Sequence, residues 1–159
     1  MRAGDDAERS DEEERRHGIE WDQLSVPVEL PQVVDEIDYQ RVVMNSGATW
    51  DYFPGHFDPV YAQSQGHPTI FVNTMHIAGF VDRIATEWAG PTSRVVRRKM
   101  TLAGPIYAGD TMVGAGRAVA KRADTTVEPP RYLVDLQIEV TNQRGELCCP
   151  AELTLQVLG

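Results

Sequence analysis

Apolar and polar residues alternate most strictly at the C-terminal end of the chain. Two segments, 131–141 and 146–157, place apolar side chains at every second position, with Leu133 as the exception. Because successive side chains of a strand point to opposite faces, this pattern predicts two strands with one face buried. Residues 142–145 between them predict the turn of a hairpin. Pro150 cannot donate to a strand ladder, so we expect its amide side at an edge or a bulge.

Helical spacing replaces this alternation between Thr74 and Trp88. Apolar residues recur there at every third or fourth position, which predicts a helix with one buried face. Asn73 or Thr74 is expected to cap its start, and the pair Gly90-Pro91 is expected to end it.

The remaining segments complete the predicted fold. Two more strands are expected around 94–103 and 111–122, with a turn between them, and residues 19–34 are expected to be extended. The order is therefore an extended lead-in, a loop, one apolar helix and four antiparallel strands. This order predicts an α+β hotdog fold, in which a curved antiparallel sheet wraps one central helix. One helix leaves a sheet edge and an apolar flank uncovered, so we expect a dimer.

Charge is distributed unevenly along the 159 residues. The net charge is -9, and residues 1–40 alone hold 13 acidic and 4 basic side chains, so the rest of the chain is balanced. We interpret residues 1–18 as a disordered acidic tail, with an acidic interaction arm as the alternative, and 19–159 as one hotdog domain. Because residues 41–159 have no net charge, nucleic acid is disfavoured as the main partner, since phosphate binding needs a basic surface.

Other compositional features exclude several classes of protein. No run approaches the roughly 20 apolar residues of a membrane span, and the N-terminal segment lacks the apolar core of a secretory signal. We therefore expect a cytoplasmic protein. The two cysteines, Cys148 and Cys149, are adjacent and would point to opposite faces of a strand. They are expected to be reduced thiols, which excludes a disulfide framework and a CxxC site.

Reactive side chains are densest between Asp51 and Pro59. Pro54 and Gly55 predict a turn, and Asp58 with Pro59 predicts the start of a short helix. The turn can bring the Asp51 carboxylate and the His56 imidazole to one point. Such a pair can hold and activate water for addition to a polarised double bond. On spacing alone, two solvated or structural side chains remain the alternative.

This segment resembles the hydratase signature of the MaoC-like dehydratases, the R-specific enoyl-CoA hydratases. That signature is Asp, two residues, Pro, one residue, His, one residue and Asp, and it stands here as Asp51, Pro54, His56 and Asp58. The similarity covers roughly 35–159. It extends to the MaoC-type subunit of the heteromeric enoyl-CoA hydratases of bacterial steroid side-chain degradation through residues 69–75, 79–83 and 87–91. Residues 105–111 also resemble a strand turn of the family.

The resemblance implies hydration of a trans-2-enoyl-CoA thioester to an R-configured 3-hydroxyacyl-CoA, with dehydration as the reverse reaction. Asp51 and His56 would be the catalytic pair that handles water, and a steroid side chain is one candidate acyl group. No metal or redox cofactor is implied, since coenzyme A is part of the substrate. The family usually has a glycine-containing turn before the central helix, whose amide serves as oxyanion donor. Here that place is Asn73-Thr74, where helix amides would polarise the thioester and the Asn73 side chain would donate or only cap.

Other candidate substrate-binding residues are less specific. Gly55 belongs to the turn that carries His56. Arg97 and Arg98 lie in the basic cluster 94–99, where they would meet the phosphates of coenzyme A or form a solvated strand face. Bulky aromatic residues on both sides of Asp51 depart from the family pattern and are expected to reshape the mouth of the pocket.

The other histidines are expected to be structural. His67 lies in a predicted turn and is expected to be solvated, and His76 is expected to be a neutral residue in the first turn of the helix. The histidine and aspartate spacings do not favour a metal site.

Two other functions compete with the hydratase. One is a non-catalytic subunit of a heteromeric hydratase, which would shape the acyl tunnel for another chain. The other is an acyl-CoA thioesterase, in which water would attack the thioester carbonyl. The expected partners are an acyl-CoA substrate and either a second copy of the chain or a second MaoC-like chain.

Overall fold

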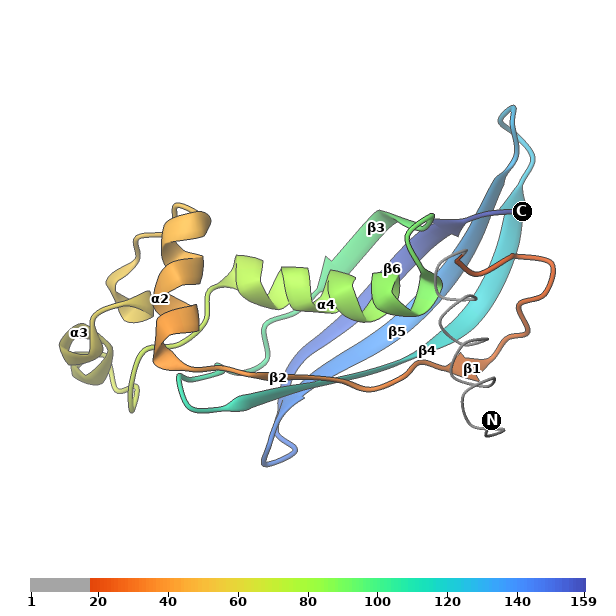
Figure 1. The fold of residues 1–159 in the computed structure, drawn as a ribbon. Coiled ribbons are helices and arrows are strands. Elements are labelled where there is room, and N and C mark those ends of the chain that lie inside the picture. Colours follow the sequence, from red (N-terminus) through yellow and green to blue (C-terminus); the bar gives the residue numbers. More distant parts are fainter. Residues whose placement is uncertain (1–17) are drawn as a thin grey trace, which may run out of the picture.

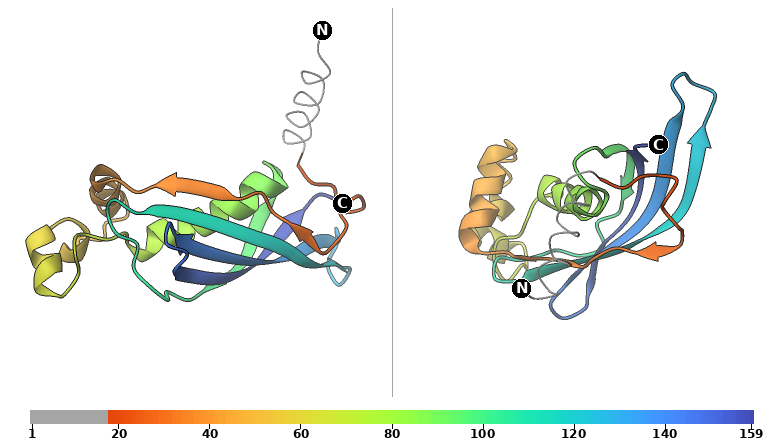
Figure 2. Two further views of the ribbon diagram at one scale, coloured as in Figure 1. Left: turned by 90° about the horizontal axis from the view of Figure 1, so that it is seen from below. Right: turned by 45° about the vertical axis from the view of Figure 1, so that its right-hand side comes forward.

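A computed structural model describes residues 18–159, so the tail predicted for residues 1–18 lies outside the described residues except for Gly18. One long helix, α4 (Thr74–Ala89), lies against the concave face of an antiparallel sheet of six strands (Figure 1). The strand order is β1-β4-β5-β6-β3, with β2 also paired to β4. The strands are β1 (Val28–Glu29), β2 (Val33–Glu36), β3 (Arg94–Met100), β4 (Thr111–Asp124), β5 (Arg131–Asn142) and β6 (Leu147–Val157). This is the predicted hotdog arrangement, and the curvature of the sheet around α4 is visible in Figure 2.

The core lies between α4 and the sheet. It contains the residues that the strand alternation and the helical spacing predict to be buried. The inward face of β5 and β6 is buried together with the apolar stripe of α4. Gly114 on β4 allows the close approach of the two layers, because a Cβ atom there would lie 2.2 Å from Cδ1 of Ile84. Asn73 caps α4 and Gly90 ends it, as predicted.

The connection between β3 and β4 is not the turn that the sequence suggested. Among the described strands, β3 pairs only with β6, whereas β4 pairs with β5, β1 and β2. Residues 101–110 therefore cross from one side of the sheet to the other. Pro150 does not lie on an edge strand as expected, because β6 lies between β5 and β3. It lies beside the point where β3 ends, and its carbonyl accepts a hydrogen bond from the Thr101 amide at 3.1 Å.

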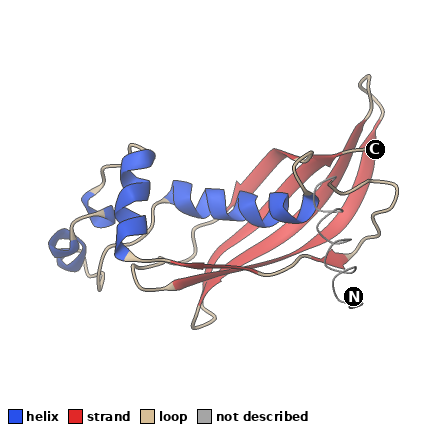
Figure 3. Cartoon of the chain, viewed as in Figure 1, coloured by secondary structure: helices blue, strands red, loops and turns tan. Residues whose placement is uncertain are grey.

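Three short helical segments lie beyond the N-terminal end of α4 (Figure 3). They are α2 (Tyr39–Ala48), the 3-10 turn η1 (Pro54–His56) and α3 (Pro59–Ser64). The start of α3 is as predicted, with Asp58 as cap. Helix α2, which Asp38 caps, was not predicted, because only a loop was expected between the extended lead-in and the apolar helix apart from the short helix after Asp58.

The cysteines agree with their prediction, since both are free and buried. Burial raises the pKa of both thiols, so the neutral form is favoured. Within residues 18–159, no helix is both long enough and apolar enough to cross a membrane.

Candidate active site

Asp51 and His56 face each other across the turn that separates them in the sequence. The distance from Oδ2 of Asp51 to Nε2 of His56 is 3.4 Å. The imidazole is buried, and its Nδ1 lies 2.8 Å from the carbonyl oxygen of Phe71. A carbonyl can only accept a hydrogen bond, so Nδ1 carries the hydrogen. In the neutral ring Nε2 then presents a lone pair toward the carboxylate.

This geometry suits a shared water molecule. The gap of 3.4 Å is longer than an ordinary direct hydrogen bond. The Nε2 lone pair and the carboxylate both accept hydrogen bonds, and a water molecule lying against both can donate one hydrogen to each. The oxygen of that water would then be free to approach a third atom. The arrangement can therefore hold and deprotonate water.

The end of α2 fixes the position of Asp51. The Asp51 amide donates to the carbonyl of Ser46 at 3.0 Å, and the Trp50 amide donates to the carbonyl of Gly47 at 3.3 Å. These two bonds form a Schellman cap, and the Ser46 hydroxyl donates back to the Asp51 carbonyl. Trp50 has a φ of 55°, in the left-handed region that favours glycine. The carboxylate of Asp51 thus directly follows a helix cap that has tryptophan where glycine is usual.

The backbone of Phe71 fixes the position of His56. The Phe71 amide donates to the carbonyl of Gly55 at 3.2 Å, and the Phe71 carbonyl accepts a hydrogen bond from the imidazole of His56. Gly55 is packed tightly, because a Cβ atom there would lie 2.6 Å from Cε1 of Phe53 and 3.0 Å from Cε1 of Phe71. The structure therefore gives Gly55 a packing role beside His56, and its predicted contact with substrate stays a prediction.

Asn73 uses its side chain within the protein. Its Oδ1 accepts from the His76 amide at 2.9 Å, and its Nδ2 donates to the hydroxyl of Thr49 at 2.7 Å. The side chain therefore caps α4 and ties it to the end of α2. The amides of Thr74 and Met75, in the first turn of α4, have no acceptor within the helix. These two amides are the groups available to a substrate oxygen at this position.

A cavity of about 300 Å³ opens beside this helix end. It is bounded by His56, by the start of α4 and by residues 102–105 of the connection between β3 and β4. Its full lining is His56, Phe71, Val72, Thr74, Ile77, Leu102, Ala103, Gly104 and Pro105. Most of these walls are apolar, so the cavity suits an apolar group whose reactive end lies at His56.

The predicted arginines lie elsewhere. Arg98 forms an ion pair with Asp82, farther along α4, and Arg97 is exposed on β3. Neither lines the cavity beside His56. The structure therefore brings together Asp51, His56 and the 73–74 helix end but not the two arginines, whose contact with coenzyme A stays a prediction.

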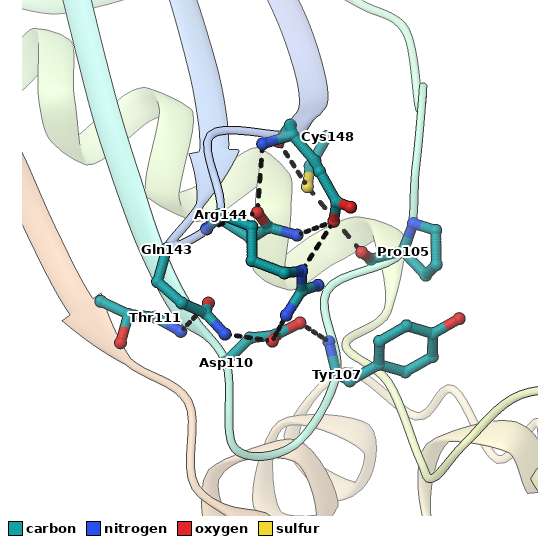
Figure 4. A network of polar contacts seen from close by, with 9 residues as sticks. Pro105, Tyr107, Asp110, Thr111, Gln143, Arg144 and Cys148 are labelled. Atoms are coloured by element: carbon teal, nitrogen blue, oxygen red, sulfur yellow. Dashed lines mark hydrogen bonds and ion pairs between the residues drawn. The ribbon is translucent and has the colours of Figure 1, made fainter.

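A buried carboxylate that the sequence did not single out, Asp110, is the centre of the polar network in Figure 4. Asp110 accepts hydrogen bonds from the Tyr107 amide at 2.9 Å, from Nε2 of Gln143 at 2.7 Å and from Nη1 of Arg144 at 2.9 Å. Burial raises the pKa of Asp110, but these hydrogen bonds and the nearby guanidinium together hold it below its usual value. Asp110 is therefore an ionised anchor for the connection that carries residues 102–105.

That connection also reaches the backbone that orients His56. The Ala108 amide donates to the carbonyl of Ile70 at 2.9 Å, and the Val72 amide donates to the carbonyl of Ile106 at 3.0 Å. Phe71, whose carbonyl holds the imidazole, lies between these two bonds. The anchored connection thus supports both the cavity wall and His56.

The predictions for the two other described histidines, His67 and His76, have different outcomes. The solvated state expected for His67 is wrong, because its ring lies 4.5 Å from that of Phe71 and its Nδ1 is 3.1 Å from the Tyr107 hydroxyl. His76 agrees with its prediction, since burial lowers its pKa and favours the neutral ring. In the part of the chain that the structure describes, no three metal-ligating side chains are grouped.

Comparison with known proteins shows the family to which the chain belongs. The family model described as "MaoC like domain" matches residues 22–131. The beta subunit of the 3-oxo-4,17-pregnadiene-20-carboxyl-CoA hydratase of Mycobacterium tuberculosis is 35% identical over 91 residues, which are 57% of this chain and 70% of the relative.

Solved structures agree with the hotdog fold. A chain of the ChsH1-ChsH2 complex of M. tuberculosis has a TM-score of 0.76 and 28% identity, with 85% of this chain and 99% of that chain covered. The R-hydratase PhaJ1 of Pseudomonas aeruginosa has a TM-score of 0.77, with 89% of this chain and 86% of that chain covered, but its identity is only 18%. The resemblance deduced from the sequence is confirmed by the family match. The chain therefore belongs to the MaoC-like domain family.

Proposed function

We propose that the chain hydrates the double bond of a trans-2-enoyl-CoA thioester to give an R-configured 3-hydroxyacyl-CoA, and that it catalyses the reverse dehydration. The observation that carries this proposal is the facing pair of Asp51 and His56 beside a helix end with open amides. Addition of water to a carbon-carbon double bond requires no net oxidation or reduction. Acid-base groups and an oxyanion site are therefore sufficient for the chemistry.

The proposed reaction begins with the thioester carbonyl at the N-terminal end of α4. Hydrogen bonds from the amides of Thr74 and Met75 would draw electron density toward this oxygen and leave the β-carbon electrophilic. The pair of Asp51 and His56 would take a proton from the water held between them as its oxygen bonds to the β-carbon. The π electrons then form an enolate on the thioester oxygen, and the pair returns the proton to the α-carbon. Atoms and charge balance without a cofactor.

The acyl group is proposed to be bulky and apolar, such as a steroid whose side chain forms the thioester with coenzyme A. The support is the substrate named for the 35% identical relative and the apolar lining of the cavity beside His56. The same relative is named as a subunit, and one matched structure is that of a two-protein complex. We therefore propose that the chain works together with a second MaoC-like chain.

A panel of straight-chain and steroid enoyl-CoA thioesters tests the reaction. Loss of the conjugated-enoyl absorbance would be followed for the wild type, for Asp51→Asn and for His56→Ala. Removal of an acid-base group is expected to lower kcat by about 10²–10⁴-fold. Asp22→Asn is the matched control, because Asp22 is an exposed carboxylate far along the chain from the pair. Its rate should equal that of the wild type.

The same assay separates the competing functions. A thioesterase would release free coenzyme A thiol, which a thiol reagent detects, whereas hydration releases none. A non-catalytic subunit would show turnover only with a second chain present, and that turnover would survive both substitutions. Full activity of Asp51→Asn and His56→Ala would therefore refute the proposed role of the pair.

A further inference from the structure

Helix α2 lies beyond the start of α4 (Figure 1), and little of it is buried. Of its ten residues only Val42 and Ser46 are buried, and Trp50, two residues past its end, is 83% exposed. Close packing of many side chains is what fixes one element against another, and α2 has little of it. Asp51 follows this end of the helix. The position of its carboxylate relative to α4 therefore depends on other contacts.

A hydrogen bond between two side chains supplies such a contact. Nδ2 of Asn73 donates to the Thr49 hydroxyl at 2.7 Å, across 24 positions of the sequence. The direction of this bond is fixed by its neighbours. A backbone amide can only donate, so the Asn73 atom 2.9 Å from the His76 amide is the oxygen, and Nδ2 is left for Thr49. The Thr49 hydroxyl gives its own hydrogen to the Asn45 carbonyl at 2.8 Å and therefore accepts from Asn73.

Each partner of this bond lies next to one half of the candidate site. Thr49 is the C-terminal cap of α2 and stands two residues before Asp51. Asn73 is the N-terminal cap of α4 and directly precedes Thr74, whose amide is open to a substrate oxygen. In the proposed reaction the carboxylate acts on the water at the β-carbon, and the amide acts on the carbonyl oxygen of the same thioester. The hydrogen bond therefore joins the two groups whose separation the reaction depends on.

Burial makes this hydrogen bond costly to lose. Asn73 is 2% exposed, so loss of the Thr49 hydroxyl would leave its Nδ2 donor unpaired and away from water. The two helix ends would have to separate for water to reach that donor, and Asp51 would move with the end of α2. A displacement of about 1 Å at a reacting group can lower a rate about 10²-fold. A small movement here is therefore enough to affect turnover.

We propose that Thr49 and Asn73 are positioning residues, whose mutual hydrogen bond sets the distance between the Asp51 carboxylate and the open amides of α4. The bond acts on the transition state, in which water and thioester must be aligned, and has little effect on binding of the thioester. This inference rests on the proposed function, and it adds two residues that act through Asp51 and the helix amides.

Substitutions of Thr49 separate this role from a structural one. Thr49→Val removes the hydroxyl at almost unchanged volume, and Thr49→Ser keeps it. With the thioester that the wild type hydrates, Thr49→Val should lower kcat about tenfold and leave KM within about twofold, and Thr49→Ser should restore most of the kcat. The matched control is Asp38→Ala, which removes the cap at the other end of α2. Its urea midpoint should fall as that of Thr49→Val does, but its kcat should equal that of the wild type.

Amide hydrogen exchange tests the same bond without a thioester. The Asp51 amide is held by the Ser46 carbonyl at 3.0 Å in the cap of α2. Relative to the buried Ile84 in the middle of α4, this amide should exchange about tenfold faster in Thr49→Val and at the wild-type rate in Thr49→Ser. If Thr49→Val does not fold, Asn73→Ser replaces it, because serine can still cap α4 but is too short to reach Thr49.

Two results would overturn the proposal. One is unchanged relative exchange of the Asp51 amide in Thr49→Val. The other is an equal loss of kcat in Thr49→Val and Asp38→Ala, because lower stability would then explain both. Failure of the hydratase proposal has a different signature, which is a wild type that turns over no thioester, alone or with a second chain. In that case the exchange measurement still decides whether the bond holds Asp51 in place.

Discussion

Replacing Trp50 with glycine should make the protein more stable, although the substitution removes a large aromatic side chain. Trp50 follows the C-terminal cap of α2, and its φ of 55° lies in the left-handed region. This conformation costs an ordinary residue about 1–2 kcal/mol and costs glycine almost nothing. The indole is 83% exposed, so its removal uncovers little apolar surface.

Two smaller terms oppose this gain. Glycine loses more conformational freedom on folding, at a cost of about 0.5–1 kcal/mol. The Trp50 ring also contacts the ring of Tyr52, with centroids 6.4 Å apart, and this pair is worth about 0.5 kcal/mol at an exposed site. At the middle of these ranges the net gain for Trp50→Gly is therefore about 0.3 kcal/mol. Trp50→Ala is the matched control, because it removes the same ring but keeps the backbone strain and should lose about 0.5 kcal/mol.

Urea unfolding followed by far-ultraviolet circular dichroism measures the difference between these variants. This signal is preferable to fluorescence, because each substitution removes one of the three tryptophans. A difference of about 0.8 kcal/mol between the glycine and alanine variants corresponds to a midpoint difference of about 0.4 M urea at unchanged slope. Equal midpoints for the two variants, or a more stable alanine variant, would refute the argument that left-handed strain at this position limits stability.

The site and its supports lead to further predictions. Gly55→Ala should lower the free energy of unfolding by about 1–3 kcal/mol, measured in urea, because its Cβ atom would lie 2.6 Å from the Phe53 ring. Asn73→Ala should cost about 1 kcal/mol in the same measurement through loss of the α4 cap, and Asn73→Asp, which keeps the capping oxygen, should retain most of the stability. Asp110→Asn should cost about 2 kcal/mol at pH 7. The pKa of Asp110 is lower in the folded state than its unfolded value of about 3.9, so the carboxylate stabilises the fold fully above that pH. This stabilisation is lost as the pH falls through the folded pKa. The urea midpoints of wild type and Asp110→Asn should therefore converge in acid. For His76 the lowered pKa means that stability falls as the pH drops below about 6.5, and His76→Asn should remove this slope from the urea midpoints.

Strong periodicity is the reason that much of the fold could be predicted from the sequence. The strands at the C-terminal end and helix α4 each bury one regular face, so their patterns are visible in the residues themselves. Helix α2 could not be predicted in this way, because it buries only Val42 and Ser46 and has no apolar stripe. Its cap, Asp38, was the only local signal. The crossing between β3 and β4 was missed because strand pairing depends on residues far apart in the chain.

The residues of the candidate site could be predicted, but their support could not. The spacing around Pro54 identifies Asp51 and His56, since both belong to one short motif. The carboxylate of Asp110 is held by side chains 33 and 34 residues away, and a sequence pattern does not reveal such contacts. For the same reason the ring of His67, which packs on Phe71, was expected in solvent.

The strain at Trp50 and the position of Asp51 are connected. A glycine would satisfy the α2 cap with less strain, and most helices with this cap use one. The chain instead has an exposed tryptophan there, followed by the candidate catalytic carboxylate and by the exposed ring of Tyr52. Residues that violate a local preference without a gain in stability are most often found at functional sites. The aromatic pair around Asp51 therefore marks this loop as a candidate contact surface for a substrate or a second chain. If this explanation is correct, Trp50→Gly and Trp50→Ala should differ in stability but lose hydration activity to the same extent.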